Sequence, residues 1–517
     1  MSSLIDWPDS SGAEPERLNP ARATARAANC VFNGAVAAVI VALFAPLGVL
    51  AHPTVRRILL AVAVLNIPLP LGTYIGDREY AAEYGSLYGF SISLTTIALV
   101  GLYLPLLVRE RTGVRAEAPR RSAAGRPLIL YILFCTLSVL VADDATLALY
   151  EVTLFLQLGL LYFYIVRTVT SREEVVFVVK FLLLGLAIEA LLMVALAGGL
   201  AKLGFLGPWV NVSDDSLVSG LVRREISFLG LRARVDEVVT MGVARVGGTI
   251  GSPNDAATYL SMALTVAVSA LAVPLGHWYR RLIIFGLGSG IIALIWTFSR
   301  GAWIALILGI GILAWSGLLG SLVRRIPRRV SLWVAADLVL AGVFLYSIIG
   351  FRLTMDDRGS AESRGPLNRI AVLMIEDHPL LGVGANNFPV AMQPYITRGF
   401  AGEFLYTVHN RYLLIGSETG LIGLAAYLWF LLATLCVGWH CWSYRDSVLS
   451  PLALGCTAAL AGHMFHMFWE PFRGQSVLQL VFVIAALLVV MERVARDSHN
   501  PPGRVPAYAA PFPGFRS

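Results

Sequence analysis

The chain has 517 residues, of which 40 are basic, 33 are acidic and 57% are hydrophobic. Charged residues make up 14% of the chain, against about 25% in an ordinary soluble domain, and the mean hydropathy is +0.72. These values exclude a water-soluble globular protein and predict an all-α polytopic membrane protein. The net charge of +7 does not indicate nucleic acid as a partner, because the basic residues cluster in short loops beside apolar segments.

Apolar runs long enough to span a bilayer recur along the whole chain. The thirteen candidates lie near residues 29–50, 58–75, 87–108, 128–142, 146–166, 175–198, 255–276, 282–299, 302–323, 330–350, 411–437, 449–468 and 475–491. Arginine-rich loops, such as 109–126 and 324–329, are expected on the cytoplasmic side. Alternation from these loops predicts that two long stretches, 199–254 and 351–410, face outward.

The first run leaves the helix count open at twelve or thirteen. Strict alternation back from loop 109–126 places the N-terminus outside, whereas Arg22 and Arg26 favour the inside. The run at 29–50 is therefore either a span with its N-terminus outside, or a hairpin or surface segment.

The two outward stretches carry helical patterns of their own. Val218, Val222 and Ile226 recur at helical spacing in the first stretch, which predicts a helix on the membrane surface. In the second stretch, Pro366 is expected to open a helix that ends near residues 378–379. The glycines of residues 382–387 then predict flexible turns.

Arg300 stands between two apolar runs, directly after Ser299 and before Gly301. Two readings are open for an arginine at a membrane edge. Its side chain either extends to lipid phosphates, as arginines near helix ends often do, or it binds an anionic ligand on the outer face, where topology does not favour positive charge.

Arg245 begins the segment Arg-Val-Gly-Gly-Thr-Ile-Gly-Ser-Pro-Asn254, just before another span. Its three glycines let the backbone approach a ligand, Asn254 is placed to cap the next helix, and a helix N-terminus beside an arginine attracts anions. The alternative is an ordinary turn with a surface arginine. No Gly-Lys-Ser/Thr follows, so a nucleotide-binding loop is not indicated.

Histidines are the remaining candidates for chemistry. His409 lies at the outer end of the span near 411–437 and is a candidate proton acceptor, or else an interfacial histidine bonded to loop backbone. His463 and His466 are one helical turn apart. They are either metal ligands or, without an acidic or cysteine partner beside them, a packed or pore-lining pair.

The outward loops carry an excess of positive charge. An anionic partner at the outer leaflet is the simplest physical reason for it. The arginines concerned are Arg352, Arg358, Arg364, Arg369, Arg398 and Arg411.

Four stretches together resemble the O-antigen ligase and polysaccharide polymerase superfamily. They are residues 245–254, Thr297-Phe-Ser-Arg-Gly-Ala-Trp303, Asp377-His-Pro-Leu-Leu-Gly-Val-Gly-Ala-Asn-Asn-Phe388, and His409-Asn-Arg-Tyr-Leu with Glu418-Thr-Gly-Leu-Ile-Gly423. Their order and spacing match across about residues 245–430. The resemblance implies an inner-membrane glycosyltransferase that moves a glycan from undecaprenyl diphosphate to an acceptor sugar on the periplasmic face, without nucleotide or metal.

The resemblance also implies roles for single residues. Arg245 and Arg300 match arginines that bind the donor diphosphate, Arg369 is a weaker match in the loop helix, and His409 matches the histidine beside the acceptor. Guanidinium groups bind phosphate oxygens in pairs and stabilise a diphosphate leaving group. The mechanistic hypothesis is direct displacement at the anomeric carbon with inversion, with His409 orienting or deprotonating the acceptor hydroxyl.

The implied partners are the undecaprenyl-diphosphate-linked glycan, a glycan or lipid A core acceptor, membrane lipids and other polysaccharide-assembly proteins. The subtype stays open between ligase, polymerase and protein O-oligosaccharyltransferase. A transporter or flippase of lipid-linked glycans is the competing class, although it should place more charge in a central cavity. A sensor or scaffold would leave Arg245, Arg300 and His409 unexplained.

Composition, hydropathy and the resemblance together divide the chain. The expected regions are a polar N-terminal segment (1–28), an N-terminal transmembrane region with an outer stretch at 199–244 (29–244), a catalytic region that includes the outer loop 351–410 (245–437), C-terminal transmembrane helices (438–495), and a disordered Pro-rich tail (496–517).

Overall fold

The computed structural model describes residues 49, 52–78, 81–82, 84–111, 123–197, 210–212, 221–228, 231–240, 243–324, 364–396 and 406–499. The predicted spans at 29–50, apart from residue 49, and at 330–350 lie outside this part of the chain. So do the polar N-terminal segment, the tail after 499, Arg352, Arg358 and Arg398.

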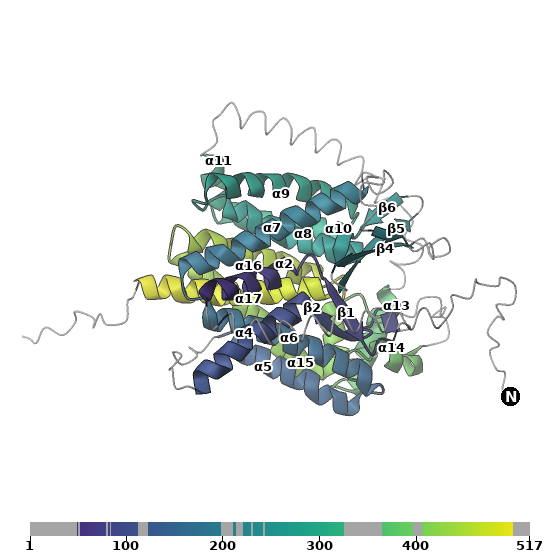
Figure 1. The fold of residues 1–517 in the computed structure, drawn as a ribbon. Coiled ribbons are helices and arrows are strands. Elements are labelled where there is room, and N and C mark those ends of the chain that lie inside the picture. The colour runs from purple at the N-terminus through teal and green to yellow at the C-terminus, as the bar shows by residue number, and fades with distance from the viewer. Residues whose placement is uncertain are drawn as a thin grey trace, which may run out of the picture.

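Helices dominate the described chain and run side by side through one bundle (Figure 1). The α-helices are α2 (Pro53–Leu65), α4 (Leu94–Arg111), α5 (Gly125–Leu137), α6 (Ala145–Thr168), α7 (Arg172–Ala197), α8 (Pro253–Ala270), α9 (His277–Trp296), α10 (Arg300–Trp315), α11 (Leu318–Val323), α13 (Arg364–Asp377), α14 (Phe388–Ala391), α15 (Arg411–Ser443), α16 (Leu449–His466) and α17 (Gln475–His499). Short 3-10 helices are η1 (Ser138–Val141), η2 (Gly248–Ile250) and η3 (Gln393–Tyr395).

Length and composition identify which helices suit a membrane. The helices α6, α7, α9, α15 and α17 are long and apolar enough to cross one, and α4, α5 with η1, and α10 are shorter apolar helices. The predicted helical multi-pass class is therefore confirmed, whereas the count of twelve or thirteen stays a prediction. The span predicted at 58–75 is wrong, because α2 ends at Leu65, ahead of Pro68 and Pro70, which oppose helix continuation.

The bundle has buried inner helices and outer helices that expose apolar side chains. α17 is buried along almost its whole length and packs against α6, α15 and α16. By contrast, the outer helices α9 and α10 expose Ile284, Ile292 and Ile307. A helix with apolar residues on every side, part of them exposed, is the pattern of a helix in contact with lipid.

A six-stranded antiparallel sheet lies at one end of the bundle (Figure 1). Its strands are β1 (Gly72–Ile75), β2 (Phe90–Ser93), β3 (Val210–Val212), β4 (Leu221–Phe228), β5 (Leu231–Thr240) and β6 (Val243–Val246). They are ordered β2-β1-β5-β4-β3, and β6 pairs with β5. This sheet was not predicted from the sequence.

The surface helix expected around residues 218–229 is wrong, since this stretch contributes strand β4. Residues four apart share a face of a strand as well as of a helix, so the apolar spacing fits both structures. Pairing with β5 decides between them: Phe228 lies opposite Leu231, and the register continues to the pair Leu221 and Val238.

A break in α15 joins the two glycine-rich motifs. Gly420 has φ 74° and ψ 176°, and a Cβ there would lie 2.2 Å from the carbonyl oxygen of Leu380, so a glycine is required. The freed carbonyls of Ser417 and Glu418 accept the N–H groups of residues 383 and 384 at 2.8 and 3.0 Å. Residues 382–387 are therefore a packed, hydrogen-bonded segment and not the flexible turns that the glycines suggested.

The helix termini form two distinct ends of the bundle. At one end, Arg172 pairs with Asp446 at 2.6 Å, and Arg493 donates to the carbonyl of Val169. At the other end, Asp144 N–H donates to Asn387, and Arg411 N–H donates to the carbonyl of Met467. Arg280, which lines a cavity together with Asp446, also lies at the first end, so arginines gather there, as is typical of a cytoplasmic side.

Candidate functional site

Arg245, at the end of β6, contacts both the following helix and the turn between α9 and α10. Its Nε donates to the carbonyl of Thr297 at 2.8 Å, and a terminal nitrogen donates to Asn254 Oδ1 at 2.9 Å. Asn254 is therefore not the helix cap that the sequence suggested. Ser252 caps α8 by accepting from the N–H of Asp255, which leaves the Asn254 side chain to join the site.

The turn between α9 and α10 carries Arg300. Phe298 adopts φ 52°, a conformation that side chains rarely take, and Arg300 is the first residue of α10. Gly301 lies against His466, because a Cβ there would be 2.3 Å from Nε2 of that ring. Arg245 thus holds the same turn that presents Arg300, so the fold brings these two predicted residues to one place.

Glu470, in the connection between α16 and α17, links the Arg245 region to α13. Its Oε1 accepts from Asn254 Nδ2 at 2.8 Å and lies 3.6 Å from a terminal nitrogen of Arg364. Burial raises the pKa of Glu470 to about 7, although the charges of Arg364 and Arg245 act in the opposite direction. This carboxyl therefore changes charge near neutral pH, in the middle of a group of arginines.

His409 lies beside the same group. Its ring stacks on Tyr406 with 5.3 Å between centroids, and Tyr406 in turn packs on Gly85, where a Cβ would be 2.5 Å from the tyrosine ring. Burial lowers the pKa of His409 to about 4, and the positive charge of Arg364 adds to this effect. The ring is therefore neutral at pH 7, and its buried Nδ1 has no hydrogen-bond partner among the described residues.

The loop helix α13 begins two residues before the expected Pro366 and buries Leu367, Ile370 and Met374, as the spacing predicted. Arg364 reaches Glu470, whereas Arg369 is exposed. Five residues on a helix correspond to a rotation of about 140°, so the two arginines face different ways. Arg364 is thus the α13 arginine that meets the cluster, and a role for Arg369 stays a prediction.

His463 and His466 form a packed pair in the last turn of α16. Both are 1% exposed, and both rings contact Phe472. Nδ1 of His466 lies 3.0 Å from the hydroxyl of Thr258. In the described ranges, no group of three or more histidine, cysteine or acidic side chains is placed to hold a metal ion.

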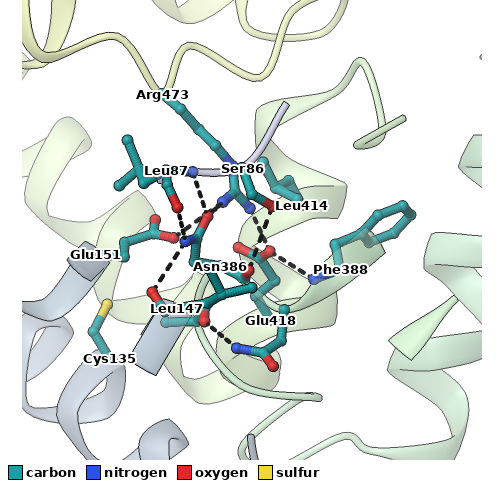
Figure 2. A network of polar contacts seen from close by, with 12 residues as sticks. Ser86, Leu87, Cys135, Leu147, Glu151, Asn386, Phe388, Leu414, Glu418 and Arg473 are labelled. Atoms are coloured by element: carbon teal, nitrogen blue, oxygen red, sulfur yellow. Dashed lines mark hydrogen bonds and ion pairs between the residues drawn. The ribbon is translucent and has the colours of Figure 1, made fainter. Parts of the chain in front are cut away.

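Arg411 lies inside the bundle and is not part of an outer basic face, as its place beside the loop suggested. It is 1% exposed and lies 3.7 Å from Glu151 of α6. Arg473 contacts Glu418 and lies 3.4 Å from Glu151. We call Arg411, Arg473, Glu151 and Glu418 the core charge network. Figure 2 shows Arg473, Glu418, Glu151 and Asn386 pointing toward one another.

The core charge network fixes the motif segments against the bundle. Asn386 donates to the carbonyls of Leu87 and Leu147 at 2.8 and 3.0 Å, and the N–H of Phe388 donates to Glu418 at 3.0 Å (Figure 2). Two arginines and two glutamates balance in charge, as burial requires. The motifs at 382–388 and 418–423 are therefore supports for the site.

Comparison with known families decides the class. Residues 284–428 match the family model described as O-antigen ligase. The chain carries an O-antigen ligase domain. The match covers the part of the chain that holds α10, α13 and the start of α15, and it supports a membrane enzyme of the ligase or polymerase type. The domain includes Arg300, Arg364 and His409, while Arg245 lies before it. No curated protein matches the chain.

Two residues of the cluster were not predicted from the sequence. Glu470 was not named as a candidate, and Arg364 was not distinguished from the other arginines of the outer loops. Glu470 lies in the turn at residues 469–474 between two apolar runs, where an acidic residue is interpreted as an ordinary loop residue. Its position directly after a predicted span, on the face assigned to the other candidates, was the available signal.

Proposed function

We propose that this protein is a glycosyltransferase that moves a glycan from an undecaprenyl-diphosphate carrier to an acceptor hydroxyl, with inversion at the anomeric carbon. The acceptor is a growing glycan or a lipid A core. The reaction takes place at the end of the bundle that carries the sheet and α13, which we assign to the periplasmic face of the inner membrane because Arg172, Arg280 and Arg493 lie at the other end.

One observation carries the proposal: a continuous polar cluster joins the diphosphate-binding candidates to the histidine. Arg245 bonds to Asn254, Asn254 to Glu470, and Glu470 pairs with Arg364, whose charge acts on His409. Arg300 extends from the turn that Arg245 holds. Cationic groups for a leaving group and a neutral base are thus within one cluster, which is the combination that glycan transfer from a diphosphate needs.

The chemistry follows from these charges. As the acceptor oxygen bonds to the anomeric carbon, the carbon–oxygen bond to the diphosphate breaks, and the diphosphate leaves with the electron pair. Arginines stabilise the negative charge that develops on it. His409 accepts the acceptor proton. A diphosphate bound beside Arg364 offsets the positive charge that lowers the pKa of His409, so donor binding makes the histidine a stronger base.

The transporter alternative gains no support from the charged residues within the bundle. Arg411 and Arg473 face Glu151 and Glu418 at ion-pair distances. Charges that neutralise one another in a packed interior suit a structural role better than a substrate path.

The test is deletion of the gene in its host, followed by analysis of envelope polysaccharide and of lipid-linked glycan. Loss of polymer with accumulation of the undecaprenyl-linked unit is expected, and the wild-type gene should reverse both. Single accumulated repeats indicate a polymerase and long accumulated chains a ligase. An unchanged polysaccharide and lipid-linked pool would refute the proposal.

Lysine at position 300 tests the mode of diphosphate binding. The change keeps the charge and removes the planar fork, so we expect Arg300→Lys, and equally Arg245→Lys, to lower transfer by roughly 10- to 100-fold, as loss of a charge-assisted hydrogen bond implies. Arg281→Lys, at the opposite end of the bundle, is the matched control and should transfer normally. Initial rates with a lipid-linked donor measure the effect. If Arg300→Lys and Arg245→Lys transferred as fast as Arg281→Lys and wild type, a guanidinium group would not be needed for diphosphate binding.

The titration of Glu470 predicts a pH dependence of donor binding. Because its pKa is about 7, the carboxyl is neutral at lower pH and becomes negative as the pH rises through this value. A negative charge among the arginines repels a diphosphate, so KM for the donor should increase between about pH 6 and about pH 8. In Glu470→Gln, the amide oxygen can still accept from Asn254, and KM for the donor should not change with pH over this range. The same increase in the variant would assign the titration to another group.

A further inference from the structure

A cavity of about 570 Å³ opens at the end of the bundle opposite the candidate site. The connection between α8 and α9 forms one wall, α11 a second, and the connection between α15 and α16 a third. Leu271, Leu275, Leu318 and Trp442 contribute apolar surface, and Arg280 and Arg445 contribute positive charge. The cavity is thus both apolar and cationic.

The acidic residue in the cavity wall, Asp446, does not neutralise these two arginines. Its Oδ1 accepts the N–H groups of Val448 and Leu449 at 2.9 and 2.8 Å, at the start of α16. Its Oδ2 pairs with Arg172 at 2.6 Å. The carboxylate is therefore already satisfied, and the cavity presents a net positive charge to any occupant.

Arg445 is held in place by its own turn. Its backbone adopts φ 57°, and its guanidinium lies 5.1 Å from the centroid of the Trp442 ring. A guanidinium stacked on an aromatic ring keeps its edge free to bind oxygen atoms in pairs. The wall that carries Arg445 therefore combines an anion-binding group with an apolar one.

Tryptophans place this cavity at the level of a membrane surface. Trp278, at the start of α9, and Trp315, at the end of α10, are 79% and 78% exposed. The ring of Trp315 stacks on Trp439 with 5.7 Å between centroids. Tryptophan is enriched where hydrocarbon meets lipid headgroups. Exposed apolar residues of α9, such as Ile284, continue from this level toward the other end.

We propose that this cavity binds the headgroup of an acidic membrane phospholipid, with the phosphodiester on Arg280 and Arg445. The apolar wall formed by Leu271, Leu275 and Leu318 then receives the glycerol and the first carbons of an acyl chain. An arginine pair suits a phosphate oxygen pair, and the position at the membrane surface favours a lipid over a dissolved anion. The inference does not depend on the proposed transfer reaction.

The test uses the purified full-length protein, stripped of lipid in detergent and then given phosphatidylglycerol, phosphatidylcholine or inorganic phosphate. Retained lipid is counted by native mass spectrometry, and the melting temperature is recorded in parallel. We expect phosphatidylglycerol to be retained and to raise the melting temperature. Neither phosphatidylcholine nor inorganic phosphate should do so at the same concentration. Equal stabilisation by phosphatidylcholine, or by inorganic phosphate, would overturn the proposal.

A pair of double variants locates the site. Arg280→Gln with Arg445→Gln should lower phosphatidylglycerol retention by at least about 10-fold, since two charge-assisted contacts are lost. Arg281→Gln with Arg324→Gln removes two exposed charges at the same end of the bundle but outside the cavity wall, and it should retain lipid normally. Equal loss in both would mean general electrostatic attraction and would refute a specific site.

Discussion

Replacing His409 by alanine should abolish glycan transfer while the protein still inserts and folds. General base catalysis contributes about 10²- to 10⁴-fold in rate, and we expect a loss of that size in initial rates. Folding should survive, because the ring is half-buried and its Nδ1 has no partner among the described residues. Truncation therefore removes little more than the stacking on Tyr406, worth roughly 0.5–1.5 kcal/mol.

Two control variants distinguish loss of the proton acceptor from a general effect of removing a histidine. His378→Ala changes an exposed histidine at the end of α13, inside the same O-antigen ligase domain, and should transfer normally. His409→Gln keeps a hydrogen-bonding side chain that cannot take up a proton, so it should restore binding of the acceptor without restoring the rate. If His409→Ala transferred normally, the proton acceptor would have to be another group, and the buried Glu470 would be the next candidate.

The sequence predicted the membrane class and singled out Arg245, Arg300 and His409 as candidates, because both results depend on local patterns. Apolar length located the helices α6, α7, α15 and α17, although the run at 58–75 failed, and Arg300 and His409 were recognised from the short motifs that contain them. The helix α13 followed from the spacing of Leu367, Ile370 and Met374. The family match at residues 284–428 then supported the resemblance read from these motifs.

Features that depend on distant pairing were not predictable in the same way. The spacing of Val222 and Ile226 suits a helix and a strand equally, and only the pairing of β4 with β5 separates them. Arg411 follows His409 by two residues, yet its side chain lies inside the bundle. There it pairs with Glu151, which is 260 positions earlier in the sequence. Likewise, Glu470 becomes a site residue only through Asn254 and Arg364.

Removing Arg473 from the core charge network should destabilise the folded protein strongly. Glu418 and Glu151 are 2% and 3% exposed, and Arg473 contacts the first and lies 3.4 Å from the second. Breaking a buried pair by deleting one partner costs about 3–5 kcal/mol, because the remaining charge is left without compensation. Arg473→Ala should therefore lower the melting temperature in detergent and the yield of inserted protein.

A compensated variant separates charge from packing in this prediction. Arg473→Met combined with Glu418→Gln removes one charge of each sign and keeps both volumes, so it should recover most of the stability lost in Arg473→Ala. Arg496→Ala, an exposed arginine at the far end of α17, is the control and should stay within about 0.5 kcal/mol of wild type. A double variant as unstable as Arg473→Ala would assign the loss to the hydrogen bond that Arg473 donates to Asn386. In that case the network would act by holding residues 386–388 in place, and charge balance would be secondary.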